Sequence, residues 1–390
     1  MPGPGGSRPR RWAGTLALAV LLGTVPTASA ATAGDGRVGS GSTATVPTGI
    51  YAGGTFSQAG GAAAAHLAAW DGAAWAALSG SAPSGSVHAL TTYRGELIAA
   101  GSFLEAGGVR VNGIARWDGA RWAPLTGPAG TGVMTNPLDF VDALAVFNDE
   151  LIVGGQFASA GGVPVNHVAR WDGARWWPLD GAAGSGVDLA AVRDLAVYDD
   201  TLVVAGGFTT AGGVPANRIA AWDGSEWSSL GPGFDGEVLA LTVHAGSLVA
   251  TGGFTQAGEA AAGHVARWDG TEWSAIGTGL DAEGRALVVH DGMLVVGGHF
   301  TRAGAEPVNY LARWDGTGWV GLSGPGGTGT DDVVLALAVR DGVLVVGGFF
   351  ERAGGVAANH VARWQSDTWS ALAGPAGAGT DGAVHTLCAV

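Results

Sequence analysis

Five side chains that could transfer protons or hold a charged ligand share one position in a repeated apolar segment of the general form V-x-A-L-x-V. At its second position the copies carry His88, Asp142, Arg193, Leu239, Arg285, Leu335 and His385, in chain order. Histidine changes charge near neutral pH, and carboxylate and guanidinium groups form strong charged hydrogen bonds. If the segments surround one axis, these side chains make a mixed polar ring that could bind a ligand. The alternative is that they pair with one another between neighbouring segments.

Other residue patterns that could support chemistry are weaker. Calcium prefers clustered carboxylate and carbonyl oxygens, but the acids that precede the repeated segments have no EF-hand spacing. These acids are Asp188, Asp235, Glu237, Asp281, Glu283, Asp331, Asp332 and Asp381. Four histidines at another repeat position belong to different repeats and cannot converge on one ion; they are His66, His167, His264 and His360. We therefore predict no catalytic residue, no metal site and no cofactor, with calcium left open without a motif to support it.

The elements that would position the ring are defined by tryptophan. Fourteen of the 16 tryptophans form pairs five residues apart, and successive pairs lie 46 to 54 residues apart. The pairs are Trp70/Trp75, Trp117/Trp122, Trp171/Trp176, Trp222/Trp227, Trp268/Trp273, Trp314/Trp319 and Trp364/Trp369. A fixed period of this length indicates a repeat architecture of seven units.

Each unit reads as four short strands, here called a, b, c and d. The segments V-x-A-L-x-V, L-V-V-G-G-x-F, N-H-V-A-R-W and W-x-x-L are short, apolar and separated by turn residues, which is typical of strands. Tight turns such as Asn148-Asp149 join a to b, and W-D-G-x-x-W joins c to d. Because strand direction alternates, the longer b–c and d–a loops share the other end of each sheet. Radial repetition of four-stranded sheets is a β-propeller.

Strand counting predicts how the ring closes. The first unit begins at Gly49-Ile50-Tyr51 without a strand a of its own, and the chain ends with an unassigned segment of that type over 384–390. Pairing this segment beside the first strand b completes seven antiparallel blades and removes two open sheet edges. The fold class is therefore all-β, a seven-bladed β-propeller closed by its C-terminal strand.

The repeat also resembles a known family. The glycine doublet that ends strand b, followed by an aromatic hairpin at a period near 50, is similar to kelch-type propellers. The fuller pattern G-G-x-F-x-x-A-G-G-V-x-x-N-x-I-A-R-W-D-G-x-x-W-x-x-L, well shown by 157–179 and 208–221, resembles a bacterial secreted repeat family. That family is similar to the extracellular propeller of fungal cortical-polarity marker proteins. The resemblance covers nearly all of 49–390 and implies interaction at the cell surface or outside it, with no assigned reaction. Copper-radical sugar oxidases also carry kelch-like propellers, but one cysteine and four tyrosines give no basis for their crosslinked copper site.

The N-terminal segment and the composition indicate where the protein acts and which partners it can have. Residues 1–30 have a basic start, an apolar run and the sequence Ala28-Ser29-Ala30, which predicts an export signal peptide. Residues 31–47 are expected to be a flexible lead-in, and residues 48–390 the propeller. Removing 1–30 takes away three arginines and no acid, so the formal charge falls from −14 to −17. This acidic chain contains no lysine, which argues against nucleic acid and acidic membranes as partners. No later segment is long and apolar enough to span a bilayer.

These features predict a secreted, extracellular, non-catalytic binding or scaffold protein. Its ligand would be an unknown extracellular protein or glycan held by the face with the long loops, and the mouth residues His88, Asp142, Arg193, Arg285 and His385 are its candidate binding residues. The alternative is an extracellular carbohydrate-active enzyme with carboxylates and histidines at the channel mouth. Two carboxylates about 5–10 Å apart in a cleft would favour the enzyme.

Overall fold

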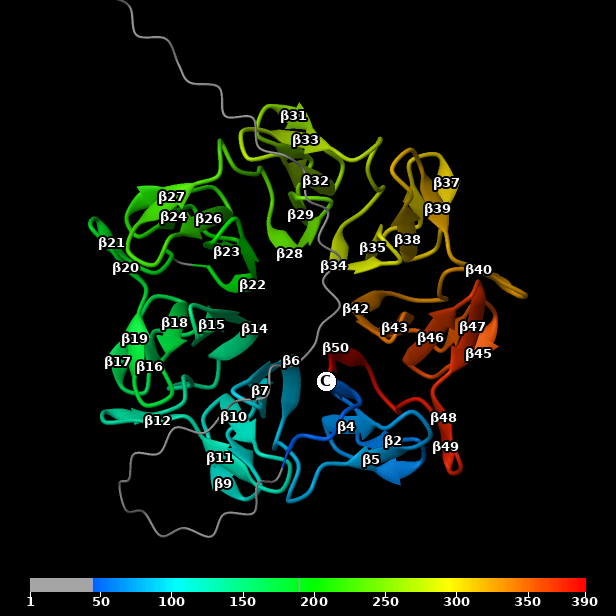
Figure 1. Ribbon diagram of the computed structural model, residues 1–390, viewed down its shortest axis with the longest axis horizontal. Helices are drawn as coiled ribbons and strands as arrows, with labels where there is room; N and C mark the ends of the chain where they lie inside the picture. Colours follow the sequence, from blue (N-terminus) through cyan, green and yellow to red (C-terminus); the bar gives the residue numbers. More distant parts are fainter. Residues whose placement is uncertain (1–44, 189) are drawn as a thin grey trace, which may run out of the picture. The chain divides into compact units, whose positions relative to one another are not determined.

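The computed structural model describes residues 45–188 and 190–390, and every regular element within them is a β-strand. Seven four-stranded antiparallel sheets surround one axis (Figure 1), which confirms the predicted fold class. No helix that could cross a bilayer is found in the part of the chain that the structure describes. The predicted signal peptide and residues 31–44 of the predicted lead-in lie outside the described residues.

Each blade runs a, b, c, d from the axis outward. Blade 1 contains β50 (Val384–Ala389), β1 (Ile50–Gly54), β4 (Leu67–Trp70) and β5 (Trp75–Ala77). Blade 2 contains β6 (Ser86–Tyr93), β7 (Glu96–Ser102), β10 (Ile114–Trp117) and β11 (Trp122–Pro124). Blade 3 contains β14 (Phe140–Phe147), β15 (Glu150–Gln156), β18 (Val168–Trp171) and β19 (Trp176–Pro178). Blade 4 contains β22 (Val192–Tyr198), β23 (Thr201–Gly206), β26 (Ile219–Trp222) and β27 (Trp227–Ser229).

The remaining blades repeat the same order. Blade 5 contains β28 (Val238–His244), β29 (Ser247–Gly252), β32 (Val265–Trp268) and β33 (Trp273–Ala275). Blade 6 contains β34 (Gly284–His290), β35 (Met293–Gly298), β38 (Leu311–Trp314) and β39 (Trp319–Gly321). Blade 7 contains β42 (Val334–Arg340), β43 (Val343–Gly348), β46 (Val361–Gln365) and β47 (Thr368–Ala371).

The C-terminal strand closes the ring as predicted. β50 pairs antiparallel with β1, so Tyr51 lies opposite Cys388 and Ala52 opposite Leu387. Two further backbone bonds join Gly49 and Val390, at 3.0 and 2.9 Å. The first and last segments of the chain therefore build one blade between them, and neither is left as an open inner edge.

Turn chemistry separates the two ends of the propeller. The a–b turn Asn148-Asp149 has φ of 50° and 60°, the paired positive values that a two-residue hairpin turn needs. In the c–d turn of blade 3 the Asp172 carboxylate accepts the backbone N–H groups of Ala174 and Arg175. We call this end the turn face, and the end that carries the b–c and d–a loops the loop face.

The loop face is built from small extra hairpins. Those in the b–c loops are β2 (Gln58–Ala59) with β3 (Ala62–Ala63), β8 (Glu105–Ala106) with β9 (Val109–Arg110), β16 (Ser159–Ala160) with β17 (Val163–Pro164), β24 (Thr210–Ala211) with β25 (Val214–Pro215), β30 (Gln256–Ala257) with β31 (Ala260–Ala261), β36 (Arg302–Ala303) with β37 (Glu306–Pro307), and β44 (Arg352–Ala353) with β45 (Val356–Ala357). Those in the d–a loops are β12 (Thr126–Gly127) with β13 (Gly130–Thr131), β20 (Asp180–Gly181) with β21 (Gly184–Ser185), β40 (Ser323–Gly324) with β41 (Gly327–Thr328), and β48 (Ala373–Gly374) with β49 (Gly377–Ala378).

The hydrophobic core lies between blades. The cluster that joins blades 2 and 3, for example, includes Ile98 from β7 and Val153 from β15, both almost fully buried. The phenylalanine that follows each strand b is at most 2% exposed in every blade. These residues are Phe56, Phe103, Phe157, Phe208, Phe254, Phe300 and Phe350. Each sheet thus buries both faces against its neighbours, and burial of this kind is the main force that holds the ring.

Candidate functional site

A β-bulge near the start of every inner strand aims one side chain at the axis. In β14, Val141 pairs with Gly155 and Ala143 with Gly154, so Asp142 between them has no partner in the ladder. The same register shift falls at the second position of the repeated segment in each inner strand, at His88, Asp142, Arg193, Leu239, Arg285, Leu335 and His385. A bulge turns the extra residue away from the regular alternation of the strand. The bulges therefore direct toward the axis the same seven residues that the sequence analysis identified as a polar ring.

All seven of these side chains line one cavity of about 300 Å³ on the axis. The five predicted binding residues are thus brought together, and Leu239 and Leu335 form an apolar part of the wall. We call this cavity the axial mouth. It opens into a deeper part of the channel of about 210 Å³, lined by Asp194 and by apolar side chains such as Leu287 and Leu337.

The polar residues of the mouth also pair between blades, so both sequence-based interpretations describe part of the structure. Asp142 receives His88 Nδ1 at 3.1 Å on one oxygen and Arg193 Nη1 at 2.7 Å on the other. Arg193 extends the chain through Nε to Glu237 Oε1 at 2.8 Å. Arg285 lies apart from this chain and pairs with Glu283, with Nη2 to Oε1 at 2.6 Å. The result is one continuous arc of paired polar side chains and one separate ion pair.

The histidines of the ring stack on each other. The rings of His88 and His385 lie 5.7 Å apart and within 16° of parallel. Burial, and then the neighbouring His88, lower the pKa of His385 to about 4. His385 is therefore neutral at neutral pH and offers the mouth a neutral hydrogen-bonding ring.

Several residues of the mouth were not predicted. Phe140 and Phe349 place aromatic rings 6.4 Å from His88 and 6.3 Å from His385. Asp194 lies in the channel wall at a position where five other blades carry alanine in the matching bulge register. Its carboxylate accepts the backbone N–H groups of Leu195 and Leu241 at 2.8 and 2.6 Å, yet burial raises its pKa to about 6. The alanine-to-aspartate departure was a usable signal for Asp194.

Most acids of the d–a loops have a structural function. Five of them accept two consecutive backbone N–H groups of the next blade's b–c loop, at 2.7–3.0 Å. We call them the clamp aspartates: Asp188, Asp235, Asp281, Asp331 and Asp381. Burial would raise the pKa of these carboxyls, but the N–H and hydroxyl donors outweigh it for Asp188, Asp235, Asp281 and Asp381, whose pKa is lowered. Across residues 45–188 and 190–390, no group of three or more metal-ligating side chains is found.

The tryptophan pairs also join blades. In six blades the second tryptophan donates its indole N–H to a backbone carbonyl at the end of the previous blade's strand d, at 2.9–3.3 Å. These donors are Trp75, Trp176, Trp227, Trp273, Trp319 and Trp369. The two members of each pair face each other directly across the c–d hairpin, as in Trp171 and Trp176.

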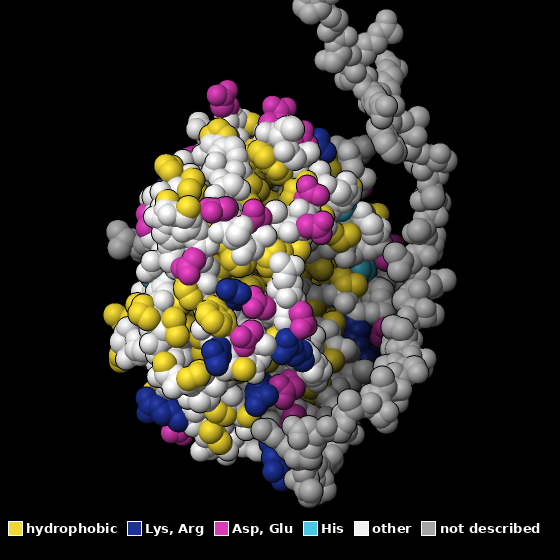
Figure 2. Space-filling model, turned by 60° about the vertical axis from the view of Figure 1, so that its left-hand side comes forward, with side chains coloured by type: hydrophobic (Ala, Val, Ile, Leu, Met, Phe, Trp, Pro, Cys, Tyr) yellow, Lys and Arg dark blue, Asp and Glu magenta, His cyan; other side chains and the backbone are white. Residues whose placement is uncertain are grey.

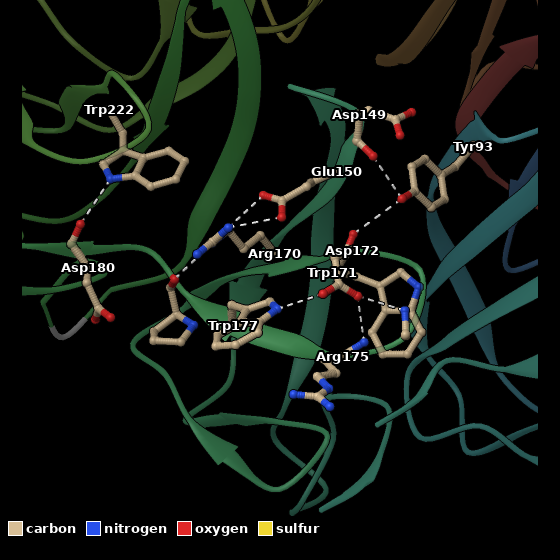
Figure 3. A network of polar contacts seen from close by, with 12 residues as sticks. Tyr93, Asp149, Glu150, Arg170, Trp171, Asp172, Arg175, Trp177, Asp180 and Trp222 are labelled. Carbon is tan, nitrogen blue, oxygen red and sulfur yellow. Dashed lines mark hydrogen bonds and ion pairs between the residues drawn. The ribbon is translucent and has the colours of Figure 1, made fainter. Parts of the chain in front are cut away.

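Strand c carries an arginine just before its tryptophan in five blades, at Arg116, Arg170, Arg267, Arg313 and Arg363. Arg170 and Arg313 lie over Trp222 and Trp364 of the next blade, at 5.9 and 5.1 Å. Figure 3 shows Arg170 held by both oxygens of Glu150, at 2.9 Å, beside Trp177, whose indole donates to Asp172. His66 and His264, which lie just before strand c, bond carbonyls of their own blade.

Comparison with known proteins agrees with this geometry. A profile for a β-propeller domain of unknown function, DUF5122, matches residues 290–317 and 340–367, which belong to blades 6 and 7. The chain is a β-propeller. No curated protein matches the propeller in sequence.

Three solved structures resemble the propeller. The computationally designed Ika8 protein is 15% identical, with 89% of this chain and 98% of that chain covered and a TM-score of 0.49. The extracellular domain of the hybrid two component system BT4673 from B. thetaiotaomicron is 11% identical, with 77% and 35% covered and a TM-score of 0.48. The WD40 beta propeller domain of Doa1 is 13% identical, with 73% and 81% covered and a TM-score of 0.44.

Proposed function

We propose that this protein is a secreted, non-catalytic binding or scaffold protein that holds an extracellular protein or glycan at the axial mouth of its loop face. The observation that carries the proposal is that bulges in all seven inner strands direct side chains into one cavity. A framework needs only the repeated residues, whereas these seven positions vary in charge, size and polarity. Concave sites with a few polar groups on apolar walls are typical ligand sites.

The character of the surface supports an extracellular protein partner or glycan over nucleic acid. The chain has 33 acids and 19 bases. On the side shown in Figure 2, arginines are interspersed with acidic side chains instead of forming a continuous basic patch. Nucleic-acid sites require such a patch. The export signal predicted over 1–30 and the resemblance to kelch-like secreted repeats support extracellular action.

The alternative, a carbohydrate-active enzyme, draws less support from the mouth. A glycosidase needs two carboxyl groups that can reach the bond to be broken. Both oxygens of Asp142 are already engaged, and Glu237 is bound to the same guanidinium, Arg193. A bound saccharide would have to displace these partners before either carboxylate could react.

The test is a binding screen of the full chain against a glycan array and a library of secreted proteins. Arg285→Ala should weaken binding of a ligand by about tenfold, since a charged hydrogen bond contributes about 1.5–3 kcal/mol. The matched control is Arg363→Ala, which removes a strand-c arginine whose Nε bonds Ser370 of its own blade. Unchanged binding in Arg285→Ala would contradict the mouth as the site. Turnover of a sugar polymer that Asp142→Asn abolishes would overturn the non-catalytic assignment.

A further inference from the structure

Blade 2 departs from the repeat at the position of the clamp aspartate. The five clamp aspartates each end a Gly-x-Asp sequence, whereas in blade 2 the matching sequence is Gly132-Val133-Met134. The chain also turns away from blade 3 here, because the Met134 N–H bonds the Asn112 carbonyl of its own blade at 3.0 Å. The d–a loop of blade 2 is therefore free to form a different structure.

That structure is a short, self-supporting insertion over 135–139. Asp139 is only 5% exposed, and its carboxylate accepts the backbone N–H groups of Thr135 and Asn136 at 2.7 and 3.0 Å. It also receives the side-chain amide of Asn136 at 2.6 Å. A buried carboxylate with these partners fixes the insertion in one conformation.

Gly113 gives this insertion its room. The other blades carry a large residue at the matching place, just before strand c: His66, His167, Arg218, His264, Tyr310 and His360. At Gly113 a Cβ atom would lie 2.6 Å from Met134 Cγ, so Met134 occupies the space that a side chain fills elsewhere. Two departures from the repeat, at positions 113 and 134, therefore depend on each other.

The insertion forms one wall of a pocket of about 430 Å³, which we call the blade 2 pocket. Its other walls come from Leu104 and Arg110 of the b–c loop and from Ser102 at the end of β7. This volume exceeds that of the axial mouth and lies in the range of ligand sites. The pocket therefore has the size of a binding site, and the insertion that forms one of its walls is not part of the repeat.

The two loops that form this pocket carry exposed apolar side chains, of which Leu104 is in the lining. Leu104 is 43% exposed, Val109 is 40% exposed and Leu138 is 75% exposed, and all three belong to the loops of blade 2. Exposed apolar groups that cluster beside a cavity mark sites of protein interaction. The aromatic ring in the lining, Phe103, is 2% exposed and offers no open face on which a sugar could stack.

The pocket adjoins the axial mouth. Ser102, in its lining, pairs with Ser86 at the start of β6, two residues before His88 of the mouth. The insertion leads directly into Phe140, whose ring lies 6.4 Å from His88. A ligand that occupies one site can therefore extend into the other.

We propose that the blade 2 pocket anchors a bulky apolar side chain of an acidic peptide segment, whose chain continues over the axial mouth. This inference rests on the proposed binding function and selects its protein option over glycan. The apolar lining suits the anchor, and Arg110 is the charged side chain in the lining that the structure describes, so a neighbouring Asp or Glu of the partner would pair with it. Buried apolar anchors carry most of the affinity in protein interfaces.

The test is selection of random 12-residue peptides, displayed on phage, with the full chain as bait. Enriched peptides should carry a large apolar residue beside Asp or Glu. Leu104→Asp should weaken their binding at least about tenfold, and Arg110→Glu should weaken it to a similar extent. Ala158→Asp is the matched control, since it places the same charge at the same repeat position of blade 3 and should leave binding unchanged.

The outcomes separate this inference from the proposed function. Peptides that lose affinity with Arg285→Ala but bind Leu104→Asp normally would overturn the pocket and leave the mouth as the site. A selection that enriches no peptide, or peptides without an apolar and acidic pair, also overturns it. Both pocket variants change exposed side chains, and an unchanged melting curve for each would confirm that loss of binding is not loss of folding.

Discussion

Blade 2 and the other blades are joined to their neighbours differently. Five junctions combine a clamp aspartate with an indole N–H bond across blades, as Asp235 and Trp273 do between blades 4 and 5. Between blades 1 and 2 the Trp122 indole N–H is buried without a partner among the described residues, and the Ser84 hydroxyl replaces the aspartate. Between blades 2 and 3, Met134 stands at the position of the clamp aspartate and has no carboxylate to accept the N–H groups of the next blade.

Blade 2 also differs from the regular blades in its cavities. Blade 2 lines the pocket of about 430 Å³ and shares one of about 270 Å³ with blade 3, and its Trp122 reaches a third of about 260 Å³ that is otherwise lined by blade 1 and the loop after it. Close packing and complete hydrogen bonding hold a framework together, whereas a binding site needs open volume and free groups. The regular junctions thus serve stability, whereas blade 2 lacks two interblade contacts at the junctions that these three pockets adjoin.

Removal of residues 384–390 should have the largest effect, because it breaks the ring at a regular junction. The deletion takes away the inner strand of blade 1, including the fully buried Val384, and exposes the edge of β1. We expect the melting temperature to fall by about 10 °C or more, measured by calorimetry or circular dichroism. An unchanged melting curve would show that the strand does not hold the ring closed.

A pair of tryptophan substitutions compares the two kinds of junction directly. Trp227→Phe removes an indole N–H that bonds the Leu179 carbonyl at 3.0 Å, whereas Trp122→Phe removes one without a partner among the described residues. Both variants lose the same ring volume, so packing losses largely cancel. We expect Trp227→Phe to cost about 2–3 kcal/mol of unfolding free energy and Trp122→Phe about 1 kcal/mol less, measured by urea unfolding. Equal losses would mean that the indole bonds do not distinguish the junctions.

The clamp aspartates should contribute less, since they lie nearer the surface. Asp235→Ala leaves the Thr255 and Gln256 N–H groups without their acceptor, and we expect a loss of about 1–2 kcal/mol in the same urea experiment. Asp180→Ala is the control, because it also removes one acid from a d–a loop. The backbone carbonyl of Asp180, not its carboxylate, accepts the Trp222 indole N–H, so this bond is kept in the variant. Similar losses in both variants would attribute the effect to charge alone.

The repeat explains why so much of this molecule could be predicted from sequence. A constant tryptophan spacing fixed the number of blades, and the unpaired segment at 384–390 fixed the closure. His88 and Asp142 were placed in one mouth because equal positions in a ring must face the same axis. The bulge that turns them inward has no sequence signature. Glu237, which pairs with Arg193 of the mouth, comes from a loop whose course depends on packing.

The blade 2 pocket escaped prediction for a related reason. Its signals, Gly113 and Met134, are visible only as departures when the repeats are compared position by position. Even then, the two positions lie 21 residues apart, and their contact arises because the insertion folds back over its own blade. Departures from a repeat therefore locate a site better than they describe its shape.

Asp194 offers the smallest and sharpest test of that rule, since it is a departure that faces the channel. Burial raises its folded pKa to about 6, against roughly 4 in an unfolded chain, so the folded protein binds the proton more tightly. Its contribution to stability is therefore full below about pH 4 and is lost as pH rises through 6. Asp194→Asn removes this dependence. Because Asp194 is partly exposed and lines the channel, solvent reduces the effect. We expect the unfolding free energy of the variant, relative to that of the natural chain, to be only about 1 kcal/mol higher at pH 7.5 than at pH 4, measured by urea unfolding at both values. If the difference in unfolding free energy between the variant and the natural chain is the same at both pH values, the Asp194 carboxyl is not in a less polar environment than water. Asp194 would then be a structural residue of the propeller and not a special feature of the channel.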